Sequence, residues 1–524
     1  MATDVKFESL SPSEWFRRNK ELAGFANPSR ALYQAVRELI ENALDATETF
    51  GIHPFIKAYI KYAERDNWLS IYVEDNGIGI PKDEIPNVFG RVFYSSKYKV
   101  KQHRGIFGLG AKMVILYAQS TTNKPITVIS AQQGSDKVYR FDIMIDTLRN
   151  EPLIKYQEEW DNKYKWHGTA VHVVMEGDWL KAKHRVEEYI KRVAMVAPYA
   201  EIHVKEPDGA VIDIERVTLT LPIPPKEGLP HPKSVDIEAV KQLISRNGDS
   251  PVSEFMVENF DGVGEETAMN FLQSIGIDPG RNIKELNTDE ITHLVTKMRE
   301  YNEWRRPRAD WLSPVGTELL EQGIRKTLEP EAVFATTRKP SSYSGNPFIV
   351  EAAVAWGGKI EPSDRPIIYR FANKVPLLYD EGNDVVRHVV DEVDWSLYKV
   401  KFPAPLVVVV HICSTKIPYA SAGKEAIADV PEIESEVRLA IREVARRLRV
   451  YLSRKEKEKE AMMRYAMFTM FSREVASSIA SILGIKEDQV LNKLKKVISR
   501  KIKYLEAIEE VEGDGEQQQQ QGQA

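Results

Sequence analysis

The sequence contains a single cysteine, Cys413, among its 524 residues. No disulfide can form within such a chain, and zinc sites built from several cysteines are excluded. Cys413 follows the apolar run at residues 406–412, where a buried and unreactive thiol is expected. This cysteine usage is typical of a reducing compartment, so we expect a cytoplasmic protein.

Long apolar runs and an excess of positive charge are also missing. No stretch of about 20 apolar residues occurs, so no membrane span is expected, and the first residues lack the pattern of a signal peptide. The formal net charge is -5, whereas a small nucleic-acid-binding domain is usually basic. Any DNA contact must therefore use local basic patches, such as residues 305–308 and 446–449, or depend on a partner. Solvated helix faces are the alternative explanation of these patches.

The length predicts about three domains. The proline-rich segment Leu221-Pro222-Ile223-Pro224-Pro225 indicates a boundary after a first section with mixed helix and strand patterns. Residues 233–306 show helical patterns and few strand patterns. Strands return in residues 307–430, where the valine-rich run at 406–412 is typical of a strand covered on both faces.

A long helix is expected next, because apolar residues recur at spacings of three and four. These are Ile433, Val437, Ile441, Val444, Leu448 and Leu452. Residues 454–460 alternate in charge, as on a solvated helix. Apolar residues resume at 462–482, which predicts a small helical bundle or a docking surface for a partner. Five glutamines at 517–521 predict a disordered tail after Glu510.

Residues 30–50 read as a helix with a broad apolar side. Glu38, Asn42 and Asp45 are spaced by four and three residues, so they share a second stripe. A solvated acidic face is the simpler interpretation of such a stripe. Because so many other positions of this helix are apolar, we favour a stripe that lines a cavity.

Residues 69–75 alternate between apolar and polar positions, as in a strand. This period places Asp75 on the apolar face, where a carboxylate is costly unless a hydrogen-bond donor meets it. Gly77 and Gly79 follow and permit tight turns. Asp75 is suited to accept a hydrogen bond from an adenine amino group, although a capped turn would also explain the segment.

A glycine-rich loop precedes a helical pattern at residues 113–118. A loop of this kind at a helix N-terminus offers N–H groups and a positive dipole to phosphates. It is not a Walker A loop, because Ala111 stands where that pattern requires lysine. The loop consists of Gly105, Ile106, Phe107, Gly108, Leu109, Gly110, Ala111 and Lys112.

Together, Glu38-Leu39-Ile40-Glu41-Asn42, Asp75-Asn76-Gly77-Ile78-Gly79 and the glycine-rich loop resemble, in order and spacing, the ATP boxes of the GHKL superfamily. His167-Gly168-Thr169 resembles its last box. The superfamily includes DNA gyrase B, MutL, heat-shock chaperone ATPases and sensor histidine kinases. The resemblance implies a Bergerat-type α/β sandwich with ATP between the helices and the sheet.

The resemblance also implies roles for these residues. Glu38 is expected to be the general base, Asn42 the Mg²⁺ ligand and Asp75 the reader of adenine N6. Thr169 would support the adenine contact. Asp45 belongs to the nucleotide-binding stripe, and Ser96, Lys97 and the glycine-rich loop would surround the phosphates.

Within the superfamily, the sequence is most similar to topoisomerase VI B subunits. The similarity lies in Tyr94-Ser95-Ser96-Lys97-Tyr98, in the helical insert around Gly262-Val263-Gly264, and in the segment from Ser421 to Glu425. In that segment, Lys424 corresponds to the family's lysine that touches the γ-phosphate, and we treat it as catalytic. Trp395-Ser396-Leu397-Tyr398 matches a Trp-Lys-x-Tyr element only partly, because serine replaces lysine.

This family resemblance implies a multidomain α+β protein. We expect a GHKL ATPase domain at 1–228, a helix-two-turn-helix domain at 229–306 and a transducer domain with a long C-terminal helix at 307–470. A helical segment at 471–510 and a disordered tail at 511–524 would follow.

The implied activity is ATP-dependent passage of one DNA duplex through a double-strand break made by an A subunit. The implied cofactors are ATP and Mg²⁺. The implied partners are double-stranded DNA and the A subunit in an A2B2 heterotetramer, with ATP-dependent dimerisation of B. A MutL-like DNA clamp without strand passage and a chaperone-type ATPase are the alternatives.

Overall fold

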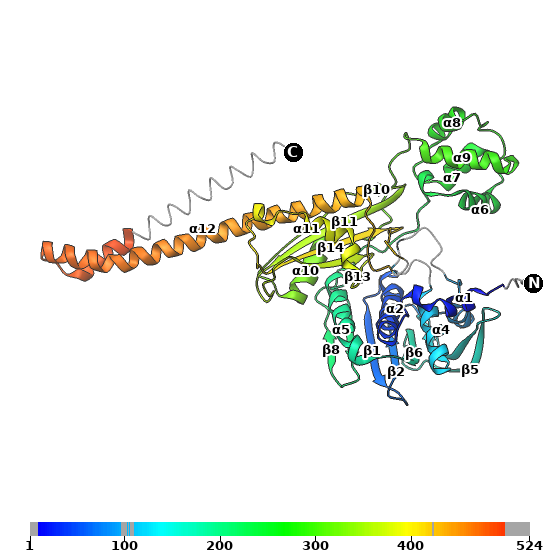
Figure 1. Cartoon of the computed structure of the whole chain (residues 1–524), viewed down its shortest axis with the longest axis horizontal. Helices are drawn as coiled ribbons and strands as arrows, with labels where there is room; N and C mark the ends of the chain where they lie inside the picture. Colours follow the sequence, from blue (N-terminus) through cyan, green and yellow to red (C-terminus); the bar gives the residue numbers. More distant parts are fainter. Residues whose placement is uncertain (1–8, 96–101, 103, 105–108, 422–423, 498–524) are drawn as a thin grey trace, which may run out of the picture. The chain divides into compact units, whose positions relative to one another are not determined.

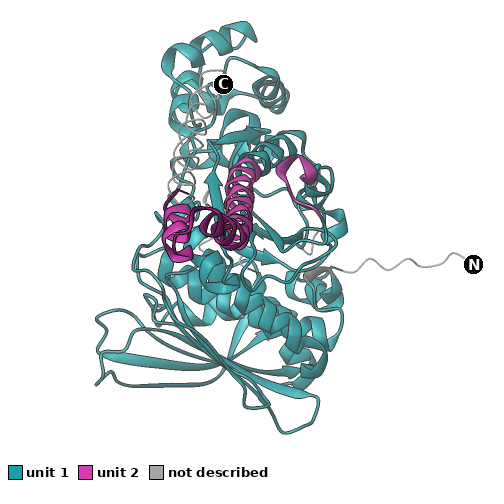
Figure 2. Ribbon diagram, turned by 90° about the vertical axis from the view of Figure 1, so that its left-hand side faces the viewer, with its two compact units in different colours: residues 1–394, 402–444 teal, residues 395–401, 445–524 magenta. Residues whose placement is uncertain are grey.

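A computed structural model of the chain describes residues 9–95, 102, 104, 109–421 and 424–497. These residues form two compact units (Figure 2). One unit comprises residues 1–394 and 402–444, and the other residues 395–401 and 445–524. Among the described residues, no helix combines the length and apolar character that a bilayer span needs. The predicted tail after Glu510, with its glutamines, lies outside the described residues.

The first unit begins with a sheet of eight strands in its described part (Figure 1). The spatial order is β5-β4-β3-β6-β2-β1-β7-β8, and only β1 and β7 pair in parallel. The strands are β1 (Phe55–Tyr62), β2 (Trp68–Glu74), β3 (Ile126–Ala131), β4 (Lys137–Asp146), β5 (Glu151–Asp161), β6 (Gly168–Glu176), β7 (Glu201–Lys205) and β8 (Val211–Ile214).

A layer of helices packs on this sheet. The helices are α1 (Pro12–Arg18), α2 (Pro28–Glu48), α3 (Ile85–Gly90), α4 (Gly110–Thr122) and α5 (Trp179–Val196). Helix α2 contacts α4 on one side and α5 on the other. The predicted helix at residues 30–50 is therefore confirmed, and it starts two residues earlier than expected. Asn27 caps it by accepting a hydrogen bond from the Arg30 N–H at 2.9 Å, and Pro28 occupies its first turn.

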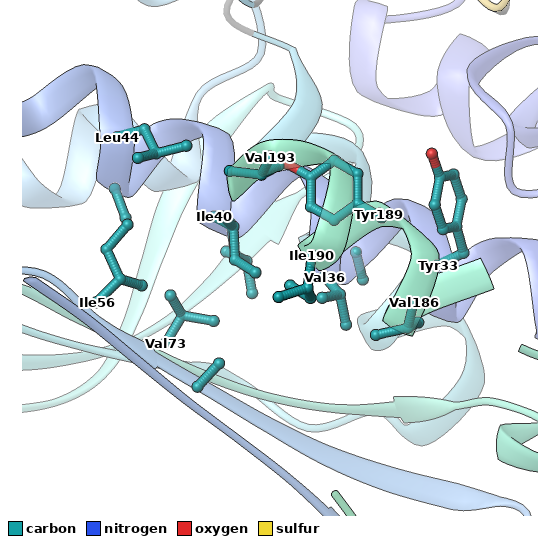
Figure 3. Close-up of a cluster of buried hydrophobic side chains, with 14 of the residues drawn as sticks. Tyr33, Val36, Ile40, Leu44, Ile56, Val73, Val186, Tyr189, Ile190 and Val193 are labelled. Atoms are coloured by element: carbon teal, nitrogen blue, oxygen red, sulfur yellow. The ribbon is translucent and has the colours of Figure 1, made fainter. Parts of the chain in front are cut away.

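The core of this layer joins α2 and α5 to the central strands. Figure 3 shows Val36 and Ile40 of α2 facing Ile190 of α5 and Val73 of β2. Each of these side chains is at most 3% exposed. Burial of a side chain of this size stabilises the fold by about 1.5–3 kcal/mol. The apolar side of α2 is therefore buried in the core, whereas the stripe with Glu38 and Asn42 is not needed for this packing.

The predicted helical section folds as four α-helices with their own core. They are α6 (Ile237–Asn247), α7 (Val252–Asn259), α8 (Glu265–Ser274) and α9 (Thr288–Glu300). The core includes Phe255, Phe260, Phe271 and Trp304, each less than 9% exposed. Glu265 and Glu266 occupy the first turn of α8, so the helix that follows Gly262-Val263-Gly264 begins with acidic rather than basic side chains.

A second sheet follows, with the path β10-β11-β14-β12-β13 and β9 also paired to β11. Its strands are β9 (Ala332–Thr337), β10 (Ser341–Tyr343), β11 (Asn346–Trp356), β12 (Ile367–Ala372), β13 (Val375–Leu377) and β14 (Leu406–Ser414). Every residue of β14 is buried, which confirms that the valine run is covered on both faces. Cys413 is fully buried there, and burial raises the pKa of its thiol well above the ordinary value.

Three α-helices precede, interrupt or follow the strands of the second sheet in the sequence: α10 (Thr317–Leu328), α11 (Val385–Asp391) and α12 (Pro431–Leu483). Residues 431–444 of α12 bury the predicted apolar stripe, with Ile433, Val437 and Ile441 at 0% exposure. In the second unit, α12 continues without a break through the charged residues 454–460. Ala476 and Ala480 then pack against Val490 in the helical residues 487–497. The domain boundaries at residues 228, 306 and 470 stay predictions.

Candidate functional site

One cavity of about 950 Å³ collects most of the predicted site residues. It lies between α2, the end of β2 and the start of α4. Its walls include Glu38, Asn42, Asp45, Asp75, Gly79, Leu109, Gly110, Ala111, Lys112, Thr169 and Lys424. Gly77 lies next to the wall, bonded to Asp75. Ser96, Lys97 and the loop residues Gly105, Ile106, Phe107 and Gly108 lie outside the described residues.

Asp75 is held at the bottom of this cavity by backbone groups. Its Oδ1 accepts hydrogen bonds from the Gly77 N–H at 2.8 Å and the Thr169 N–H at 3.2 Å. Among the described residues, Oδ2 has no hydrogen-bond partner. Burial raises the pKa of the carboxyl to about 7, although the two N–H donors oppose that shift. Oδ2 is therefore a buried acceptor in the cavity wall, which suits an amino group of a ligand.

Strands β6 and β3 fix the surroundings of Asp75. Asp75 N–H donates to the Thr169 carbonyl at 3.0 Å, which continues the β2–β6 pairing past the end of β2. The Ser130 hydroxyl lies 3.1 Å from the Thr169 hydroxyl and accepts from the Ile80 N–H at 2.8 Å. Ser130 is fully buried and was not predicted. It stands in an ordinary strand pattern, so no local signal identified it.

Gly79 allows the turn after Asp75 to pass close to β3. Its φ is +72°, and a Cβ atom there would overlap the Ala131 carbonyl. A side chain is therefore excluded both by the backbone conformation and by the neighbouring strand. The turn brings Ile78 and Ile80 into the cavity wall beside Asp75, so the glycine shapes the apolar part of the pocket.

Glu38 and Asn42 of α2 also line the cavity. Among the described residues, the Glu38 carboxylate makes no hydrogen bond or ion pair. It lies so close to the first residue of α4 that a Cβ atom on Gly110 would overlap it. The start of α4 also offers N–H groups that have no partner within the helix. A carboxylate and a helix N-terminus thus face the same space.

Asp45 has a partner that sequence reasoning did not identify. The Arg104 guanidinium donates to Asp45 Oδ1 at 2.8 Å and to Glu48 Oε1 at 2.6 Å. Lys374, in the turn between β12 and β13, lies 3.4 Å from the other Glu48 oxygen. Arg104, Glu48 and Lys374 are each less than 9% exposed. This buried cluster therefore fixes Arg104, the residue before the predicted glycine-rich loop, against α2.

Lys424 reaches the cavity from the segment after β14, although it is 386 residues from Glu38 in the sequence. The described residues contain no cluster of three or more histidine, cysteine or acidic side chains suited to hold a metal ion. Mg²⁺ usually binds through one or two protein oxygens together with phosphates and waters. The Asn42 amide oxygen in the cavity wall could serve as such a protein ligand.

One arginine of the basic patch at residues 305–308 forms an ion pair within the protein. Arg308 donates to Asp261 at 2.7 Å, and Asp261 is buried. This pair links the helical section to the segment that follows it. Arg308 is therefore explained without a nucleic acid.

Two family models match the chain. Residues 27–146 match the model described as "Histidine kinase-, DNA gyrase B-, and HSP90-like ATPase", and residues 307–464 match "Topoisomerase VI B subunit, transducer". The first match covers α2, the Asp75 turn and α4, and the second covers the sheet and segment that supply Lys424.

The similarity to known proteins covers almost the whole chain. The B subunit of type 2 DNA topoisomerase 6 from Pyrobaculum aerophilum is 59% identical over 497 residues, covering 95% of this chain and 94% of that protein. The protein of the same name from Metallosphaera sedula is 46% identical over 505 residues, with 96% and 95% covered. A solved structure described as the N-terminal domain of a DNA repair protein has a TM-score of 0.42 and 12% identity, covering 83% of this chain and 99% of its own.

Proposed function

This chain belongs to the family of topoisomerase VI B subunits, with a GHKL-type ATPase fold and a transducer, and we propose that its cavity binds and hydrolyses ATP to drive DNA strand passage. The observation that carries the proposal is the meeting of Asp75, Asn42, Glu38 and Lys424 on one cavity. Its volume of about 950 Å³ lies within the range of about 300–1,000 Å³ of ligand pockets.

In this proposal, Asp75 Oδ2 accepts a hydrogen bond from the adenine amino group, and Thr169 supports that contact. The start of α4 and Lys112 face the phosphates, where N–H groups and positive charge stabilise the developing negative charge. Mg²⁺, held by Asn42, would neutralise phosphate charge when bound. Glu38 aligns the attacking water and removes its proton, and Lys424 contacts the γ-phosphate.

The assembly that we propose is an A2B2 heterotetramer whose two B subunits close on ATP around double-stranded DNA. The A subunit cleaves the DNA. A surface of α12 supports a protein partner for the second unit: Met462, Met467, Met470 and Phe471 are each at least half exposed. Apolar patches of this kind mark interaction sites, and methionines adapt well to a partner surface. We assign the A subunit to it.

Relaxation of supercoiled plasmid tests this function. The chain, a candidate A subunit, Mg²⁺ and ATP together are expected to relax the plasmid, whereas omission of either protein or of ATP should leave it supercoiled. The MutL-like alternative is not favoured by the family membership. It would give ATP hydrolysis and DNA binding without any change in linking number in the complete mixture, and that result would overturn the proposal.

Nucleotide binding is expected to weaken as the pH falls below about 7. The adenine amino group donates a hydrogen bond, so it binds ionised Asp75 better than the protonated acid. Because burial raises the pKa of Asp75 to about 7 in the free protein, binding at lower pH must first remove a proton. The association constant should then fall by up to about tenfold per pH unit below pH 7.

Calorimetry with a non-hydrolysable ATP analogue between pH 5.5 and 8 measures this dependence. Asp75→Asn is the matched control, since its affinity changes with pH only through the phosphates and other groups. Parallel pH profiles for the two proteins would show that Asp75 does not meet the base.

A further inference from the structure

Lys424 has an uncommon backbone conformation for a residue with a side chain. Its φ is +55°, in the left-handed region that L-residues other than glycine, asparagine and aspartate rarely adopt. Such a conformation persists only where the surroundings hold it firmly. The next residue, Glu425, is only 1% exposed. Its contacts hold the backbone of Lys424 in this conformation.

The Glu425 carboxylate is bound by an arginine of the ATPase helix. Arg37 Nη1 donates to Glu425 Oε1 at 2.8 Å, and Arg37 Nε donates to Glu41 Oε1 at 2.7 Å. The side chains of Arg37 and Glu425 are 4% and 2% exposed. Arg37 is also the residue before Glu38 on α2. One ion pair therefore joins the neighbours of the two residues assigned to catalysis.

The other side of the same segment is fastened to the second sheet. Arg370 of β12 donates to the Glu425 carbonyl at 3.3 Å and to Asp384 at 2.9 Å. Asp384 also accepts from the Ile427 N–H at 2.8 Å. The segment that carries Lys424 is thus attached to the second sheet through Arg370 and Asp384, and to α2 through Arg37.

We propose that Arg37 is a positioning residue that, through Glu425, holds Lys424 at the γ-phosphate end of the cavity and so links nucleotide occupancy to the second sheet. The inference rests on the proposed function of Lys424. If Arg37 loses its charge, the buried Glu425 carboxylate loses the only cation that forms an ion pair with it among the described residues and keeps Arg30 as a more distant one, which is unfavourable. Glu425 then moves toward water and takes Lys424 with it, while the attachment to the second sheet remains.

The test compares the affinity for a non-hydrolysable ATP analogue with the affinity for ADP. Lys424 contacts only the γ-phosphate, so Lys424→Ala should lower the preference for the analogue by about tenfold, the value of one charge-assisted hydrogen bond. Arg37→Met is expected to lower the preference by a similar factor. A general loosening of the fold would weaken both ligands equally and leave their ratio unchanged. In the double variant, the loss should be no larger than in Lys424→Ala alone, because both changes remove the same contact.

Arg192→Met is the matched control. Arg192 also connects α5 to the second sheet. Its guanidinium lies 4.3 Å from the centre of the Tyr369 ring of β12, and it forms an ion pair with Glu188 of α5. Its guanidinium donates to Glu188 and to the Leu377 carbonyl, and it contacts neither Arg37 nor Glu425, so this variant should keep the wild-type ratio.

Glu425→Gln provides a second variant should Arg37→Met fail to fold, because it keeps the side-chain shape and removes the ion pair. The inference is overturned if both Arg37→Met and Glu425→Gln retain the wild-type ratio while Lys424→Ala loses it. A wild-type ratio in Lys424→Ala itself would instead refute the role proposed for Lys424. Additive losses in the double variant would also count against positioning.

Discussion

Replacing Glu38 by glutamine is expected to lower ATP turnover by about 10²- to 10⁴-fold, the usual contribution of a general base. The change keeps the shape of the side chain and removes its ability to accept a proton. Glu38 lines the cavity from α2, faces the start of α4 and makes no hydrogen bond or ion pair among the described residues. Its carboxylate is therefore available to a water molecule rather than committed to the fold.

Nucleotide binding should survive this change. In the proposed site, adenine recognition depends on Asp75 and Thr169. Asp75 follows β2 and Thr169 lies in β6, so neither comes from the Glu38 turn of α2. Steady-state phosphate release measures turnover, and calorimetry with ADP measures binding in the same preparation. Normal hydrolysis by Glu38→Gln would show that another group is the base, whereas loss of ADP binding would show that Glu38 supports the cavity.

A methyl group on Gly110 should reduce turnover by about 10²-fold, the effect of misplacing a reacting group by about 1 Å. The Cβ atom of alanine would occupy the position of the Glu38 carboxylate. Either Glu38 must turn away or the start of α4 must retreat from it. Both responses separate the proposed base from the helix N-terminus that we expect to face the phosphates.

Stability should change little in Gly110→Ala, by no more than about 1 kcal/mol, because the displaced atoms are the end of a flexible side chain. Gly264→Ala is the matched control: Gly264 precedes α8, and a Cβ atom there would have no neighbour within 4 Å. Phosphate release and thermal unfolding of both variants test the expectation. A Gly110→Ala protein with wild-type turnover would mean that Glu38 does not act from the position seen here.

Local sequence patterns predicted several of the side chains that line the cavity. The apolar period of α2 left Glu38, Asn42 and Asp45 on a separate stripe, and all three line the cavity. The alternation in β2 placed Asp75 inward, where it is 7% exposed. These features follow from the 3.6- and 2-residue periods of helix and strand, which depend only on neighbours in the chain. Lys424 was identified by family resemblance rather than by periodicity.

Other groups at the site were outside the reach of such patterns. Ser130 lies in an ordinary strand, and only the pairing of β3 with β6 brings its hydroxyl to Thr169. The ion pairs of Arg104 with Asp45 and Glu48 likewise depend on tertiary structure, because 59 and 56 positions separate the partners in the chain.

What the sequence determined by itself was the inventory of the site: an inward acid after one strand, an acid and an amide on one helix, and glycines where the backbone must turn. Tertiary structure decided which charges are paired. Arg37 and Glu425 are separated by 388 positions, and nothing in either local pattern specifies the other. A buried charge is tolerable only beside its partner, and that neighbour is chosen when the two sheets and α2 pack together, not by the residues adjacent in the chain.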